Sequence, residues 1–246
     1  MAFLIGCASR EELIKKSTQQ YEYGLVYLEK GNLARAYEEF EKARGTAPEN
    51  DRAYFGLGLI YYFQGHFEKA RSSYKKAIEL NPQVPEYYNN MAAVLAKLGR
   101  WKDVIQYCQV ALEYPNYSTP GFAYYNMGCA YMNLGELRKS YEFLQRSKEE
   151  NNSYIDTHLQ LGKVLFKLGD VASAIISFKE AEKLEADATS EDFSLQAEIG
   201  YHLAQSYLEL GDIPLAKQTF MSVIEKAPGS KFAEESARYL KELRYY

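Results

Sequence analysis

The sequence lacks several features that mark particular classes of protein. Among its 246 residues, no apolar run reaches the 18 or more that a membrane-spanning helix requires. Lys and Arg total 29 against 33 for Asp and Glu, so there is no basic excess to bind phosphate backbones. The three scattered cysteines, Cys7, Cys108 and Cys129, are too few for a disulfide framework or a tetrahedral zinc site. We therefore expect no membrane-spanning helix, no nucleic-acid partner and no structural metal.

The components of an active site are also missing. The histidines, His66, His158 and His202, fall in three different repeats of the pattern described below, so they do not converge on one metal. No Ser, Cys or Lys nucleophile has a base beside it. Every glycine belongs to a turn or to the repeat, which leaves no phosphate-binding loop. We expect a non-enzymatic protein with no catalytic residues, no cofactor and no small-molecule substrate.

What the sequence does contain is a repeat. Six glycines each follow an apolar-periodic stretch, with successive separations of 34, 34, 36, 34 and 42 residues: Gly31, Gly65, Gly99, Gly135, Gly169 and Gly211. A small residue stands seven positions before each of them: Gly24, Gly58, Ala92, Gly128, Gly162 and Ala204. A larger one stands nine positions after each: Phe40, Tyr74, Cys108, Leu144, Phe178 and Phe220. Such self-similarity is typical of a repeat architecture.

The pattern predicts a helix hairpin in each repeat. The small residue lets the second helix approach the first, and the larger residue fills the space between them. The turn glycine accepts the left-handed backbone that ends the first helix, and Asp170 and Asp212 can cap the second. Pro48, Pro82 and Pro228 then stop the second helix. Two extra residues within 114–120 and eight around 188–196 interrupt the period, and we expect both additions in loops.

This pattern resembles the tetratricopeptide repeat of 34 residues. The resemblance implies an all-α, right-handed superhelical solenoid of six hairpins with a C-terminal capping helix. We place the hairpins at residues 17–50, 51–84, 85–120, 121–154, 155–196 and 197–230, within a domain of residues 11–246. The capping helix is expected at residues 231–245, because Phe232, Ser236, Tyr239, Leu240 and Leu243 form an amphipathic stripe.

In folds of this kind the inner wall comes from the first helix of each hairpin. The resemblance therefore implies a partner-binding groove, for which the candidate residues are Tyr21, Leu25, Phe55, Leu59, Tyr62, Phe63, Asn89, Phe122, Tyr125 and Met132. Packing inside the hairpins accounts for about half of such positions, because register alone does not separate the two roles. We expect an apolar, salt-insensitive groove for an amphipathic helix or an extended apolar segment. The cationic clamp for an acidic C-terminus is absent, since its positions hold Tyr21, Leu25, Glu86 and Asn90.

The first ten residues resemble a lipid-anchor signal. Leu4-Ile5-Gly6-Cys7 followed by Ala8 is similar to the lipobox of bacterial lipoproteins, in which the cysteine becomes the lipidated N-terminus. The resemblance implies a lipid on Cys7, and Ala8 implies the outer membrane. Only six residues precede Cys7, which is too short for a complete signal, so this interpretation expects a truncated start. The alternative is a chance match of four residues.

Lipobox and repeats together resemble the PilF/PilW family of type IV pilus biogenesis lipoproteins, which includes the Tgl type. Its more specific marks here are Asn89-Asn90-Met91, the Tyr-Pro loop at 114–120 and the segment 122–128. The resemblance implies a pilotin on the periplasmic face of the outer membrane. Such a protein binds the pilus secretin and promotes its multimer assembly, which pilus biogenesis and twitching or social motility require. Two alternatives remain: a scaffold of another periplasmic assembly system, and a cytosolic adaptor.

Overall fold

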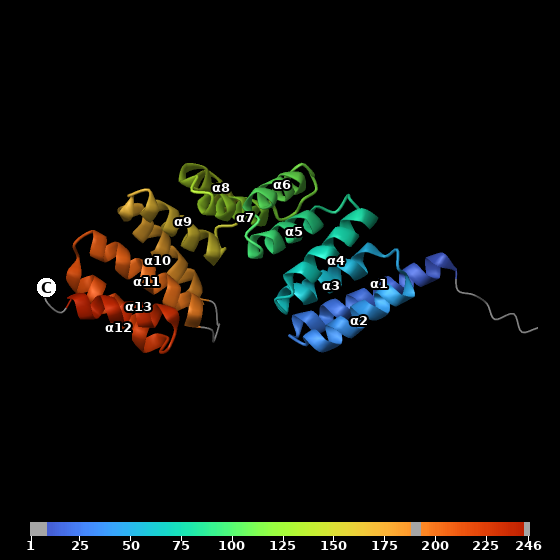
Figure 1. The fold of residues 1–246 in the computed structure, drawn as a ribbon, viewed down its shortest axis with the longest axis horizontal. Coiled ribbons are helices and arrows are strands. Elements are labelled where there is room, and N and C mark those ends of the chain that lie inside the picture. The colour runs from blue at the N-terminus through green and yellow to red at the C-terminus, as the bar shows by residue number, and fades with distance from the viewer. Residues whose placement is uncertain (1–8, 188–192, 244–246) are drawn as a thin grey trace, which may run out of the picture. The chain divides into compact units, whose positions relative to one another are not determined.

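The computed structural model describes residues 9–187 and 193–243. Within these ranges the regular structure is entirely helical and comprises thirteen helices (Figure 1). They are α1 (Arg10–Glu29), α2 (Leu33–Thr46), α3 (Asp51–Phe63), α4 (Phe67–Leu80), α5 (Pro85–Lys97), α6 (Trp101–Leu112), α7 (Pro120–Asn133), α8 (Leu137–Glu150), α9 (Ile155–Lys167), α10 (Val171–Asp187), α11 (Phe193–Glu209), α12 (Ile213–Lys226) and α13 (Lys231–Glu242). In the described ranges, no helix is both long enough and apolar enough to cross a membrane.

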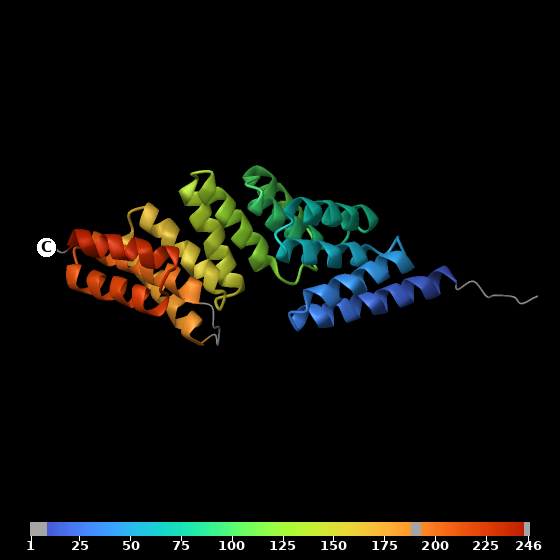
Figure 2. The same ribbon diagram turned by 60° about the horizontal axis from the view of Figure 1, so that its bottom comes forward.

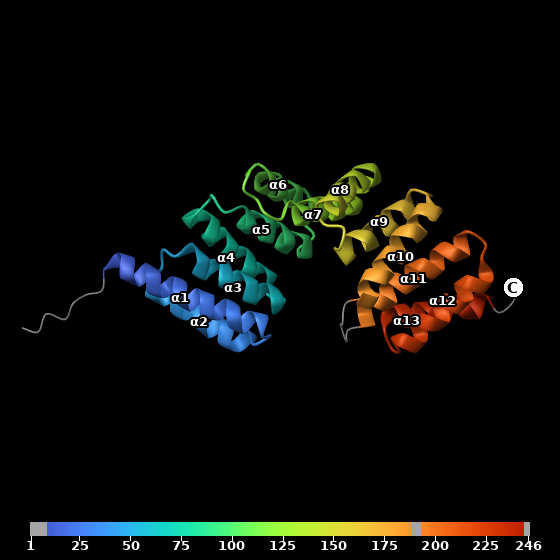
Figure 3. The same ribbon diagram turned by 180° about the vertical axis from the view of Figure 1, so that it is seen from behind.

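The chain divides into two compact units, Met1–Asn126 and Met127–Tyr246, and the boundary falls within α7. In the first unit α1 pairs with α2, α3 with α4, and α5 with α6, and the hairpins stack in chain order (Figures 1 and 3). In the second unit α9 pairs with α10 and α11 with α12, and α13 packs against both α12 and α11 (Figure 2). The all-α hairpin fold and the capping helix are thereby confirmed.

The hairpin turns follow the predicted glycine ladder. All six turn glycines have positive φ, between 71° and 84°. The residue after each glycine donates its backbone N–H to the carbonyl five residues earlier, as Asn32 does to Tyr27 at 2.8 Å and Asp212 to Tyr207 at 2.9 Å. This bond satisfies a carbonyl that the end of a helix would otherwise leave unpaired. The predicted caps are confirmed, because Asp170 accepts from the Ser173 N–H and Asp212 from the Leu215 N–H, each at 3.1 Å.

The small residues lie where the helices of a hairpin meet. Phe40 is fully buried against Gly24, and Phe178 packs in the same way against Gly162. A Cβ atom added to Gly128 would lie 2.6 Å from Cγ of Leu144, which is closer than real Cβ contacts come. The predicted pairing of small and large residues is therefore confirmed, and it sets the distance between the two helices of a hairpin.

The two interruptions of the period have different structures. Residues 113–119 form a loop, as predicted, and the Tyr114 hydroxyl ties it to the previous hairpin by donating to the Pro82 carbonyl at 2.7 Å. The sequence predicts a loop for the second addition, around residues 188–196. This prediction is wrong for residues 193–196, the end of the addition that the structure describes. Helix α11 already begins at Phe193, so residues 193–196 lengthen a helix. Extra residues at the end of a helix lengthen it without disturbing the packing of its central residues.

The first helices also carry an apolar face toward the preceding hairpin. On α3 it is formed by Leu57 and Ile60, which are 2% and 0% exposed and belong to the same core as Phe40. The same register positions on α1 hold Tyr23 and Val26, which are 51% and 44% exposed. In the described chain no hairpin precedes α1, so this face is uncovered there.

Candidate protein-binding cleft

A cleft of about 640 Å³ opens on the first unit among the first helices of its three hairpins, α1, α3 and α5. It is lined by Ile14, Thr18, Tyr21, Glu22, Leu25, Asn50, Asp51, Arg52, Phe55, Asn81, Val84, Glu86 and Tyr87. Three of the predicted groove residues, Tyr21, Leu25 and Phe55, are among them. The volume is in the range of sites that hold small molecules or a few side chains of a peptide.

The edge of the cleft is fixed by buried hydrogen bonds. Asn50 caps α3 by accepting from the Arg52 N–H at 3.1 Å, and its side-chain amide donates to Ser17 Oγ at 2.8 Å. Ser17 in turn donates to the Ala43 carbonyl at 2.7 Å. Both polar side chains are buried, and buried polar groups that are fully paired hold one geometry. The start of α3 is therefore tied to both helices of the first hairpin.

The apolar wall of the cleft is shared with the protein core. Tyr21 is only 8% exposed, its ring lies 5.6 Å from that of Phe40, and burial raises its pKa to about 12. The ring of Phe55 lies between those of Tyr74 and Tyr87, at 5.6 and 4.8 Å. Tyr21 and Phe55 therefore pack against the core and border the cleft at the same time.

Charged residues that the sequence analysis did not select also line the cleft. Asp51 Oδ2 accepts hydrogen bonds from the Tyr87 hydroxyl at 2.7 Å and the Asn81 amide at 3.1 Å. Burial, followed by the bond to Asp51, raises the pKa of Tyr87, so this hydroxyl remains a donor. Glu22 pairs with Arg52 at 3.5 Å. Glu86 is the fourth charged residue of the lining.

The remaining predicted groove residues do not line this cleft. Tyr62 and Phe63, with Leu59, lie toward the other end of α3, where the Tyr62 ring contacts Phe63 and Phe67 edge to face. Phe63 is 58% exposed, whereas Leu59 and Tyr62 are half-buried. Sequence register groups these residues with Phe55, but about two helix turns separate Phe55 in the cleft from Phe63 on open surface.

The candidates of the third and fourth hairpins are placed differently again. Asn89 on α5 accepts a hydrogen bond from the Asn126 amide on α7 at 3.0 Å, so its polar group joins two first helices. Phe122 is 40% exposed and Tyr125 is half-buried. Met132 is half-buried and belongs to the second unit. That these four side chains contact a partner stays a prediction.

The first helices of the second unit carry a polar network. Lys163 on α9 forms a half-buried ion pair with Glu198 on α11. His202 stacks on Phe178, with ring centroids 5.8 Å apart, and its Nδ1 lies 3.1 Å from Gln205 Oε1. Gln205 also donates to the Tyr201 and Tyr239 hydroxyls at 3.0 and 3.2 Å. Burial, and then the nearby Lys163 charge, lowers the pKa of His202 to about 4.

The other residues with potential chemistry are dispersed. His66 is exposed at the start of α4, and His158 is buried with Nε2 at 2.7 Å from the Asn152 carbonyl. Cys108 is buried and Cys129 is half-buried. Across residues 9–187 and 193–243, no three His, Cys, Asp or Glu side chains are grouped as metal ligands would be. Cys7, the predicted lipidation site, lies outside the described residues.

Sequence models of the tetratricopeptide repeat match most of the chain. Their matches cover residues 21–65, 59–99, 123–154, 155–187 and 198–230. No curated protein is similar in sequence at a significant level.

Solved structures with the same fold are distant in sequence. PilW, a widely conserved type IV pilus biogenesis factor, is 21% identical with a TM-score of 0.79, over 89% of this chain and 97% of its own. PilF of Pseudomonas aeruginosa is 19% identical with a TM-score of 0.75, over 94% and 99%. YrrB, a repeat protein with an unusual peptide-binding site, is 20% identical with a TM-score of 0.58, over 81% and 97%. At these identities the likeness establishes the fold.

Proposed function

We propose a specific role for this chain from the premise that it is a tetratricopeptide-repeat protein, a family of protein–protein interaction scaffolds that are generally non-catalytic. The role is that of a pilotin: the chain binds a subunit of a type IV pilus secretin and promotes its assembly in the outer membrane. The observation that carries the binding function is the cleft among α1, α3 and α5, with Tyr21, Leu25 and Phe55 in its wall.

The assignment to pilus biogenesis has separate support. The structural matches to PilW and PilF cover nearly the full length of this chain and nearly the full length of each of those proteins. The chain therefore shares its fold over nearly its full length with two pilus biogenesis proteins. A scaffold of this size needs no chemistry of its own: it holds an aggregation-prone subunit until the subunits associate.

The cleft can be tested by filling it. Thr18 on α1 lines the cleft and is half-buried, so Thr18→Trp should occupy the volume without removing a core side chain. We expect the variant to keep its helical circular dichroism and to lose heat-resistant secretin multimers and surface pili in a strain lacking the wild-type gene. The matched control is Ser72→Trp, at an exposed position of α4 outside the cleft.

If the Thr18→Trp protein folds and still supports normal secretin multimers, the cleft does not take part in secretin assembly. The exposed aromatic residues Phe63 and Phe122 would then be the next surface to test. Normal multimers in the complete absence of the chain would instead point to a scaffold of another assembly system.

The proposed anchor requires its own experiment. A lipoprotein carrying three acyl chains would remain on the membrane, because even two lipid signals suffice for stable anchoring. With a complete lipoprotein signal placed upstream, we expect the wild-type chain in the outer-membrane fraction and Cys7→Ser in the periplasmic fraction. Mass spectrometry should find the lipid on Cys7 alone. A Cys7→Ser protein that stays in the outer-membrane fraction would show that the anchor is not this cysteine.

A further inference from the structure

The charge of the cleft is unbalanced. Its lining contains three carboxylates, on Glu22, Asp51 and Glu86, and one guanidinium, on Arg52. Three negative groups and one positive group give the lining a formal net charge of −2. Such an excess on a concave, partly apolar surface raises the local concentration of cations and repels anions.

The partners of these groups show where the excess lies. The guanidinium of Arg52 forms an ion pair with the carboxylate of Glu22, at 3.5 Å. Asp51 is satisfied by two neutral donors, the Tyr87 hydroxyl and the Asn81 amide, which stabilise its charge without cancelling it. Among the described residues, no Lys, Arg or His forms an ion pair with Glu86. The uncompensated charge thus belongs to Asp51 and Glu86, at the starts of α3 and α5.

We propose that the cleft binds an apolar peptide segment carrying a Lys or Arg side chain, whose cation lies between Asp51 and Glu86 while the apolar side chains contact Leu25 and Phe55. This proposal rests on the proposed function, since it names the chemistry of the segment that the cleft would capture. It differs from the sequence-based expectation of a purely apolar, salt-insensitive groove.

Electrostatics decides among the possible segments. A hydrogen-bonded ion pair in a partly buried site contributes more than a neutral hydrogen bond, whereas an acidic side chain there would be repelled and would also lose its hydration. A neutral segment would leave the Glu86 carboxylate partly desolvated with no compensating cation. The three classes should therefore bind in the order basic, neutral, acidic.

Three synthetic peptides with acetylated and amidated ends test this order. They share one amphipathic sequence of Ala, Gln, Leu and Phe and differ at a single central residue, which is Arg, Gln or Glu. Calorimetric titration of the full chain should give a Kd about tenfold lower for the Arg peptide than for the Gln peptide, and the weakest binding for the Glu peptide. Added salt should reduce the advantage of the Arg peptide and leave the Gln peptide nearly unchanged.

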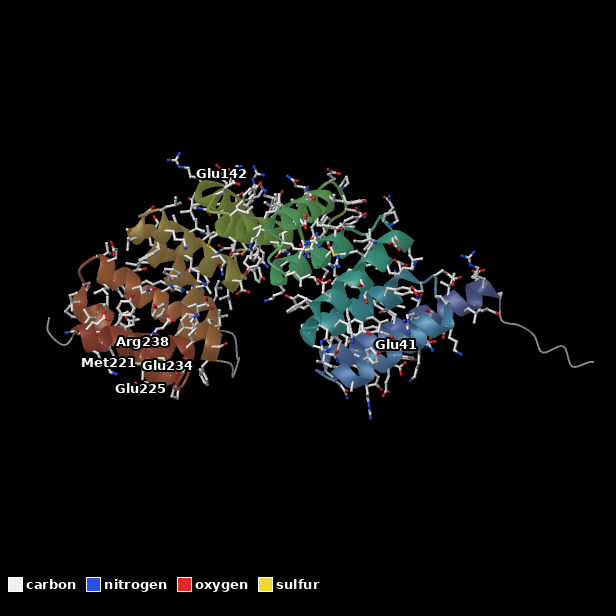
Figure 4. All side chains as sticks on the ribbon, viewed as in Figure 1. Glu41, Glu142, Met221, Glu225, Glu234 and Arg238 are labelled. Carbon is white, nitrogen blue, oxygen red and sulfur yellow. The ribbon has the colours of Figure 1, made fainter. Side chains whose placement is uncertain are left out.

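Variants of the chain locate the effect. Glu86→Gln should remove most of the advantage of the Arg peptide while the Kd of the Gln peptide stays the same. Glu142→Gln is the matched control, because Glu142 is exposed on α8 in the second unit (Figure 4) and should change neither Kd. Thr18→Trp should abolish binding of all three peptides.

The results separate the two proposals. Equal Kd values for the Arg and Gln peptides, with both lost in Thr18→Trp, would overturn the basic-residue proposal and leave the cleft as an apolar binding site. An advantage of the Arg peptide that survives Glu86→Gln would also overturn it. Absence of binding by every peptide would overturn both this proposal and the role of the cleft in the proposed function.

Discussion

At the scale of single residues, His202 lies in an environment that disfavours its charged form. The imidazole is packed between the rings of Phe178, Tyr201 and Phe232, and Lys163 adds a positive charge nearby. Glu198, Gln205 and Glu235 act in the opposite direction, but burial outweighs them and holds the pKa at about 4. The unfolded chain has no such environment, so its histidine titrates near the ordinary value of about 6.5.

This difference predicts an acid-sensitive second unit. Between pH 6.5 and 4 the unfolded chain binds a proton at His202 and the native chain does not, so the free energy of unfolding falls as the pH is lowered. The full contribution is present above about pH 6.5, and up to about 3 kcal/mol is lost by pH 4. Urea unfolding of the wild type and His202→Gln across this range should show a shallower decline for the variant. His66→Gln, at an exposed position, is the control and should follow the wild type.

At the scale of the helix hairpin, a tyrosine and a cation recur together across the turn. In three hairpins a cation four residues after the turn glycine lies over the ring of a Tyr four residues before it: Arg35 over Tyr27, Lys69 over Tyr61 and Lys139 over Tyr131, at 5.2 to 5.6 Å. In the last hairpin Leu215 stands at the position of the cation, and the ring of Tyr207 is covered by Lys179 of α10 instead, at 5.8 Å. Where the position of the Tyr holds Leu95 or Leu165, the residue in place of the cation is Asp103 or Ser173. The contact, worth about 0.5–1 kcal/mol at an exposed site, thus joins the two helices in three of the six hairpins.

The start of the second helix offers a direct comparison between hairpins. Asp212 caps α12 by accepting from the Leu215 N–H, whereas His66 occupies the same register position before α4 and forms no side-chain cap. Asp212→Ala should therefore lower the free energy of unfolding by about 0.5–2 kcal/mol, and His66→Ala by less than about 0.5 kcal/mol. Urea denaturation of both variants measures the difference. Equal losses would mean that the cap bond contributes nothing in solution.

The hairpins were predictable from sequence because each is determined by local geometry. A glycine with positive φ, a small residue at the helix crossing and a side chain that caps a helix each leave a signature within a few residues, and all were found where expected. The described end of the second addition was the exception. Residues 193–196 extend α11, because nothing in their sequence distinguishes the end of a helix from a loop next to it.

The cleft was only partly predictable. Register selects Tyr21, Leu25 and Phe55, and all three line the cleft, but Tyr21 is also part of the core and the other two pack against it. Asp51 and Glu86 were not selected as binding residues, since in sequence they are ordinary acids in the first turn of a helix. Their common position depends on how neighbouring hairpins pack, and sequence spacing within one hairpin does not contain that information.

At the scale of the whole chain, contacts join neighbouring hairpins within each compact unit, as in other repeat proteins. A local destabilisation should therefore stay local. Gly128→Ala places a methyl group against Leu144, where overpacking costs about 1–3 kcal/mol, so amide hydrogen exchange should accelerate in α7, α8 and α9. Exchange in α1 and α2 should not change.

Gly45→Ala is the matched control for this experiment. Gly45 lies within α2 with nothing within 4 Å of an added Cβ, so the same change should be neutral or stabilise the chain by up to about 1 kcal/mol. Uniform acceleration of exchange along the whole chain in Gly128→Ala would contradict local coupling. It would indicate that the two units unfold as one.

The uncovered face of α1 has a consequence for engineering the chain. Tyr23 and Val26 occupy positions that bury almost completely on α3, where a hairpin precedes them. A designed hairpin fused ahead of α1, with a second helix shaped like α2, would find an apolar docking face already in register. Alternatively, replacing Tyr23 and Val26 by Lys and Glu would seal that end as a charged cap at little cost in stability. The same residue pair thus determines whether the array can be lengthened or is terminated at its first helix.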